Sequence, residues 1–61
     1  MWICKYKIFN DGRIDAEVFE DRTVSKKIET YEERKYFDEY SESFEELDDA
    51  LNCKTNVLLE N

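Results

Sequence analysis

The residues best suited to chemistry in this sequence are carboxylates, and they are concentrated in one segment. Seven of the twelve residues in the segment 38–49 are Asp or Glu, and none is Lys, Arg or His. These acids are Asp38, Glu39, Glu42, Glu45, Glu46, Asp48 and Asp49. Clustered carboxylates can act as general acid and base, bind calcium, or attract a basic macromolecule.

Acid–base catalysis is the first of these possibilities, and Glu45 with Asp48 or Asp49 is the pair to consider. Such catalysis needs a cleft that moves the pKa values of the two carboxyl groups apart. A chain of 61 residues seldom encloses such a cleft. The absence of His removes the commonest general base as well. We therefore expect a protein that is not an enzyme and has no catalytic residues.

Metal binding is the second possibility. An EF-hand loop alternates its oxygen ligands, has a central Gly and ends on a Glu at its twelfth position. The segment 38–49 has no Gly and runs into a predicted helix. Without His, the chain also lacks the commonest metal ligand. We expect no bound metal and no cofactor.

Attraction to a basic partner is the third possibility. Residues 1–37 hold eight acids and eight bases, whereas residues 38–61 hold eight acids and one base, Lys54, and so carry the net charge of −7. Phosphate groups need Lys and Arg, so we expect no direct binding of nucleic acid. A dense row of carboxylates can instead occupy a basic groove made for phosphates, although such a row can also merely solvate one side of a protein. The predicted partner-binding residues are Asp38, Glu39, Tyr40, Glu42, Glu45, Asp48 and Asp49.

The first element predicted around these residues is an N-terminal β-hairpin. Residues 2–9 and 13–20 alternate in polarity, and the turn signal Asn10-Asp11-Gly12 separates them. A two-residue loop would place Ile8 opposite Asp15 and spoil the apolar face. A three-residue loop places Gly12 at a left-handed position and gives a continuous apolar face and opposite charges on the other face. Its pairs are Ile8–Ile14, Tyr6–Ala16, Cys4–Val18, Lys7–Asp15 and Lys5–Glu17.

Apolar residues also lie on the charged face of this hairpin. They are Ile3, Phe9 and Phe19. Either loops or C-terminal residues shield them, or they form a self-association surface. Because so small a chain has little core, we expect a homodimer with two-fold symmetry, with these three residues as its candidate contacts.

The segment 22–31 admits two structures. Val24, Ile28 and Tyr31 have helical spacing. A helix there would have bases near its start and acids near its end, which its dipole disfavours. We therefore predict a second hairpin that turns near residues 32–33. Its pairs would be Ile28–Phe37, Lys27–Asp38 and Lys26–Glu39.

A C-terminal helix completes the predicted fold. Ser43 is a suitable N-cap, and Glu46 three residues later completes a capping box. The predicted apolar stripe is Phe44, Leu47, Ala50 and Leu51. Residues 57–59 either dock as a short edge strand or extend to a partner. The expected fold is α+β: one small domain over residues 1–61, with an antiparallel sheet of three to four strands and one C-terminal helix packed on it.

The cysteines and the hydropathy of the sequence indicate in which cellular compartment the protein is found. Cys4 and Cys53 could form one disulfide, but two cysteines without a secretory signal more often stay reduced. The longest apolar run, Val57–Leu59, is too short to span a membrane. We therefore expect no contact with a membrane and a cytoplasmic location.

In size, acidity and compactness the chain resembles small inhibitors encoded by phages and other mobile elements, such as anti-restriction, anti-CRISPR and uracil-DNA glycosylase inhibitor proteins. The resemblance covers these bulk properties and no motif. It implies a non-catalytic antagonist of a larger, basic, nucleic-acid-handling protein. The alternative is a small homo-oligomer that binds a small molecule or acts as a structural accessory. An electrostatic inhibitor should lose affinity steeply as salt is added, whereas a packed pocket should not.

Overall fold

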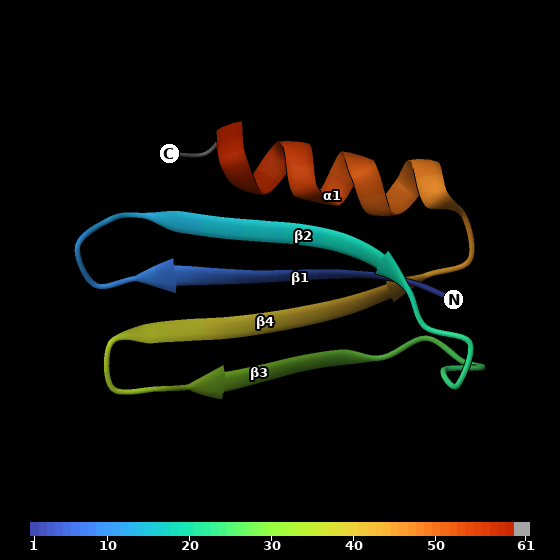
Figure 1. Cartoon of the computed structure of the whole chain (residues 1–61), viewed down its shortest axis with the longest axis horizontal. Coiled ribbons are helices and arrows are strands. Elements are labelled where there is room, and N and C mark those ends of the chain that lie inside the picture. Colours follow the sequence, from blue (N-terminus) through green and yellow to red (C-terminus); the bar gives the residue numbers. More distant parts are fainter. Residues whose placement is uncertain (60–61) are drawn as a thin grey trace.

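The chain forms one antiparallel sheet of four strands with a C-terminal helix packed on it (Figure 1). This computed structural model describes residues 1–59. The elements are β1 (Trp2–Phe9), β2 (Ile14–Glu20), β3 (Glu29–Glu33), β4 (Phe37–Phe44) and α1 (Leu47–Leu59). The strands lie in the order β2-β1-β4-β3, which confirms the predicted α+β class. Among the described residues, no helix has the length and apolar character needed to cross a membrane.

The β1–β2 hairpin has the predicted register, with Tyr6 opposite Ala16. In its loop, the backbone N–H of Gly12 donates to the carbonyl of Phe9 at 3.0 Å. The N–H of Phe9 donates to the carbonyl of Arg13 at 2.8 Å. Gly12 has a φ of +95°, a conformation that strains residues with a side chain. The local sequence alone therefore accounts for this hairpin.

The second hairpin exists, but its predicted register was wrong. The loop comprises residues 34–36, not residues 32–33, and Tyr31 lies opposite Tyr40. Ile28, which was predicted to face Phe37, lies beside Ser43 instead. Residues 21–28 form neither helix nor strand and connect β2 to β3.

Contacts with β1 explain this register. Tyr40 also pairs with Tyr6, so the observed alignment places three tyrosines side by side across three strands. The first loop in addition binds the second: the N–H of Asn10 donates to the carbonyl of Tyr36 at 3.0 Å. These contacts join segments far apart in the sequence, and a local pattern does not contain them.

The predicted N-cap was also wrong. Ser43 is a fully buried residue of β4, and its Oγ accepts a hydrogen bond from the N–H of Ile28 at 2.6 Å. The strand continues to Phe44 because Trp2 of β1 pairs with that residue. The helix therefore begins only at Leu47, after Glu46. Backbone pairing with β1 outweighs the capping box.

The helix presents a different stripe to the sheet from the one predicted. Ala50 is fully buried, and Cys53 and Val57 are half-buried. By contrast, Leu47 and Leu51 are 37% and 43% exposed. Residues 57–59 end the helix and form no edge strand.

The core is small and is divided between the two faces of the sheet, because Ile3 points away from α1 whereas the neighbouring Cys4 points toward it. Among residues 1–59, the buried apolar residues are Ile3, Cys4 and Ala50. Helix α1 packs mainly on β1 and β2 and makes no contact with β3 (Figure 1). The helix-side surface of β3 and of much of β4 is therefore left uncovered.

Candidate functional site

Three tyrosines form a row across the sheet on the helix side. Tyr6 of β1, Tyr40 of β4 and Tyr31 of β3 are direct cross-strand partners. The Tyr6 and Tyr40 ring centroids are 4.8 Å apart, and those of Tyr31 and Tyr40 are 5.0 Å apart. Such aromatic pairs contribute about 0.5–1.5 kcal/mol each beyond the area they bury. The helix borders Tyr6, whereas Tyr31 at the far end is 55% exposed.

Carboxylates flank this row on both sides. Glu29 lies opposite Glu42, and Glu33 lies opposite Asp38. Each is two residues from Tyr31 or Tyr40, so all four share a face with the tyrosines. We call this surface the acidic–tyrosine face. It comprises Glu29, Tyr31, Glu33, Asp38, Tyr40 and Glu42.

The charges of this face are mostly uncompensated. Within residues 1–59, Glu29, Glu33 and Asp38 form no ion pair. Glu42 pairs with Lys27, whose Nζ lies 3.5 Å from its Oε1. Acids directly opposite each other in a sheet lower its stability. The β3–β4 hairpin therefore carries a folding cost that its own side chains relieve only in part.

The hydroxyls of Tyr6 and Tyr31 stay protonated at neutral pH, because the pKa of each is raised. Burial is the main cause that raises the pKa of Tyr6, and the neighbouring Cys53 and Glu42 add to it. Reduced contact with water is the main cause that raises the pKa of Tyr31, followed by the Asp38 carboxylate. The Tyr31 hydroxyl donates to Oδ1 of Asp38 at 3.3 Å. The rings of Tyr6 and Tyr31 therefore add no negative charge to this face.

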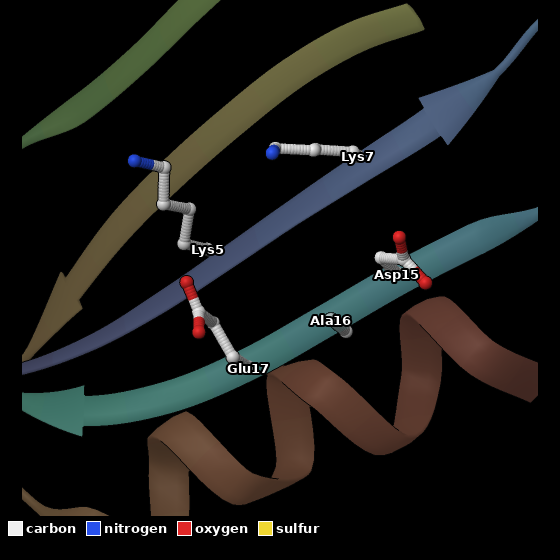
Figure 2. Close-up of a pocket in the computed structure, with 5 residues that line it drawn as sticks. All are labelled: Lys5, Lys7, Asp15, Ala16 and Glu17. Carbon is white, nitrogen blue, oxygen red and sulfur yellow. The ribbon is translucent and has the colours of Figure 1, made fainter.

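The opposite face of the sheet is closer to neutral. Nζ of Lys5 lies 3.8 Å from Oε1 of Glu39, and Nζ of Lys7 lies 4.0 Å from its Oε2. Figure 2 shows both lysines leaning toward β4, while Asp15 and Glu17 project from β2. The predicted pairing of the backbones is confirmed, but the lysine ammonium groups bind Glu39 rather than Asp15 and Glu17. These lysines and the two β2 acids line a shallow hollow.

The structure therefore divides the predicted partner-binding residues among three places. Asp38, Tyr40 and Glu42 belong to the acidic–tyrosine face. Glu39 projects from the other side of β4, with only 17% of its side chain exposed. The exposed residues Glu45, Asp48 and Asp49 surround the start of α1. Of these, Asp49 shares a groove between α1 and β4 with Glu42, so it extends the acidic surface.

The predicted self-association residues do not form one exposed patch. Ile3 is only 4% exposed and belongs to the core, so its assignment to a surface was wrong. It lies between Phe19 and Ser43, and the connection between β2 and β3 is bonded to Ser43. Phe9 packs against Phe37 with the ring centroids 5.2 Å apart. Phe19 remains 38% exposed.

Glu29, Tyr31 and Glu33 are the residues of the face that the sequence did not single out. They lie outside the dense acidic segment, and the predicted register placed them elsewhere. One signal was present: aligning Tyr31 with Tyr40 gives the observed pairing and extends the row that Tyr6 begins.

Comparison with known proteins adds no further residue to this site. No protein-family model, no curated protein and no solved structure matches the chain. The chemistry of the acidic–tyrosine face thus provides the functional clue.

Proposed function

We propose that this protein is a non-catalytic antagonist that binds a larger, basic, nucleic-acid-handling protein through the acidic–tyrosine face. One observation carries this proposal: the Tyr31–Tyr40 pair, at the end of the row that lies away from the helix, lies between two pairs of directly opposed carboxylates. Opposed acids destabilise a sheet, and cations from a partner would remove that cost. The opposed acids lower the stability of the isolated chain, and such unfavourable arrangements are typical of functional sites.

Arginine is the side chain that this face fits best. A guanidinium group stacks on an aromatic ring and at the same time donates paired hydrogen bonds to a carboxylate. Tyr31 and Tyr40 supply rings, and Glu29 and Glu42 supply carboxylates beside them. A partner whose arginines bind phosphates would offer the same groups to this face. Occupying them would exclude nucleic acid, which is the antagonism we propose.

The proposed place of action is the cytoplasm of the producing or infected cell, as for an inhibitor encoded by a phage or mobile element. Two free cysteines suit a compartment in which thiols stay reduced. The exposed acids around the start of α1 would add long-range attraction to a basic surface.

A peptide of consecutive arginines is the probe that tests the site, with a lysine peptide of equal length for comparison. The site variant combines E29Q, E33Q, D38N and E42Q. The matched control changes the same number of charges elsewhere through D15N, E17Q, E20Q and E46Q. We expect the site variant to bind the arginine peptide about tenfold more weakly than the control variant, with a shallower dependence on salt, measured by calorimetry.

Two results would contradict this proposal. Equal losses in both variants would show that net charge alone attracts the peptide. Equal binding of the arginine and lysine peptides would remove the role of the tyrosine rings. If the site variant alone loses affinity, the same two variants can be used for affinity capture from host cells. The partner is the protein that the control variant captures and the site variant does not.

A second candidate function, a homo-oligomeric accessory, is favoured by the helix. Leu47, Leu51 and Leu58 are 37%, 43% and 45% exposed. With Lys54 they follow the four-three-four spacing of a coiled-coil seam. The acidic surfaces of two copies would repel each other, whereas this leucine strip is complementary to itself. We propose a two-fold homodimer that pairs these strips and leaves the acidic–tyrosine face free.

Sedimentation velocity tests the dimer. We expect a mass near twice that of one chain at micromolar concentration. Leu51→Lys should give a monomer, because it removes an apolar contact and adds a second lysine to Lys54 in the seam. Phe19→Lys serves as the control and should stay dimeric. If Phe19→Lys alone gave the monomer, the interface would lie on the opposite face of the sheet.

A further inference from the structure

Helix packing brings together the two cysteines that the sequence separates by 49 positions. Cys4 is fully buried in β1 and lies directly opposite Glu42 of β4. Cys53 is half-buried in α1, and its Sγ lies 3.8 Å from Oε2 of Glu42. The Cys53 thiol therefore sits over the Cys4–Glu42 pair. Each thiol shifts the pKa of the other, and both are free.

We infer that Cys4 and Cys53 form a disulfide under oxidising conditions and so fasten α1 to the sheet. The bond would join the centre of the sheet to the helix that covers it. It would also close a loop of nearly the whole chain, which restricts the unfolded state more strongly than a short loop does. With so few fully buried apolar residues, this protein has much stability to gain from such a bond.

The oxidation begins at Cys53, which lines the open groove between α1 and β4. With oxidised glutathione, the Cys53 thiolate attacks one sulfur of the reagent, breaks its S–S bond and releases one glutathione thiolate. The Cys4 thiolate then attacks Sγ of Cys53 and releases the second glutathione. Two protein thiols lose two protons and two electrons in total, and the reagent disulfide is reduced to two thiols.

The surrounding groups make this reaction slow at neutral pH. The pKa of the Cys53 thiol is raised to about 12, mainly by burial and in addition by the neighbouring Cys4 and Glu42. Burial also raises the pKa of Cys4, and the interaction with Cys53, followed by the positive charge of Lys54, partly offsets this rise. Tyr6 adjoins the same groove and stays neutral there. Because only the thiolate attacks, oxidation should accelerate as the pH rises toward the pKa of Cys53.

The test is incubation of the reduced, purified chain with oxidised glutathione at mildly alkaline pH. Free thiols are counted after denaturation, and the intact mass is measured. We expect the loss of both thiols, a monomer lighter by two hydrogens, and a thermal midpoint raised by about 10–20 °C. Cys53→Ser and Cys4→Ser should form no intramolecular bond and show no such rise. Glu42→Gln should be oxidised faster, because it removes a carboxylate beside Cys53.

Three outcomes would overturn the inference. Stable glutathione adducts or disulfide-linked dimers would show that the two sulfurs do not meet in the folded chain. Two thiols that persist through prolonged alkaline incubation would show that the pair is closed to oxidation. A disulfide that forms but lowers the thermal midpoint would show that its geometry opposes the fold.

Discussion

Ile3→Ala is expected to unfold much of the protein at room temperature. Ile3 is 4% exposed and is one of the few fully buried apolar side chains. Truncation of a buried isoleucine to alanine costs about 2–5 kcal/mol. Domains of this size have about 3–5 kcal/mol of stability in total. The loss should appear as a lower urea midpoint, or as an absent folded baseline, in circular dichroism.

The control for Ile3→Ala is Phe19→Ala. Phe19 lies directly opposite Ile3 on the same face but is 38% exposed, so its truncation should cost clearly less. If both variants kept the urea midpoint of the parent and Ile3→Ala weakened self-association, Ile3 would be a surface contact after all. A larger loss for Phe19→Ala than for Ile3→Ala would equally contradict the burial of Ile3.

Ser43→Ala should produce the second large loss of stability. The Ser43 Oγ accepts a hydrogen bond from the N–H of Ile28 at 2.6 Å, and Ser43 itself is fully buried. Alanine would leave that N–H without its acceptor, and a buried unsatisfied donor costs about 1–3 kcal/mol. Because this bond ties the β2–β3 connection to β4, exchange of the Ile28 amide hydrogen should also accelerate.

Ser41→Ala is the matched control, since Ser41 shares the strand and the face of Ser43 but is only half-buried. Its urea midpoint should stay close to that of the parent. The alternative role of Ser43, as a helix cap, predicts a different pattern. In that case Ser43→Ala would fray the start of α1 and leave the exchange of the Ile28 amide unchanged.

The acidic–tyrosine face and the cysteine pair share Glu42. This residue faces Cys4 across the strands, accepts a hydrogen bond from the Cys53 thiol and pairs with Lys27. The cysteine experiments do not depend on the proposed partner, because they need only the isolated chain. A failure of the arginine peptide to bind would therefore not contradict the disulfide inference. A failure of the two cysteines to form a disulfide would likewise not contradict the proposed binding of a basic partner.

The sequence by itself determined the first hairpin. Twenty consecutive residues contain every feature that selects its register. These features are the alternation of apolar and polar residues in β1 and β2, the turn at Gly12 and the opposite charges across the two strands. The sequence also determined that a helix follows the last strand and that the fold is α+β. These features follow from periodicity and turn chemistry, which a short segment contains in full.

Only the tertiary structure decided where the other elements begin and how they pair. Ser43 followed by Glu46 is a valid capping box, but pairing of Trp2 with Phe44 keeps that segment in the sheet. The second loop has no Gly or Asn to fix its position, so its register depends on Tyr6 and on the first loop. In both cases the deciding partner lies more than twenty residues away.

The candidate site also depends on contacts between segments that are distant in the sequence. Neighbours in a strand point to opposite faces, so Asp38 and Glu39 are adjacent in the acidic segment yet lie on different sides of the sheet. Hairpin pairing then brings Glu29 and Glu33 beside Glu42 and Asp38, and helix packing brings Cys53 to Cys4. The sequence determined how much charge the chain carries, whereas strand register and helix packing decided which charges share a surface, because both depend on contacts between distant segments.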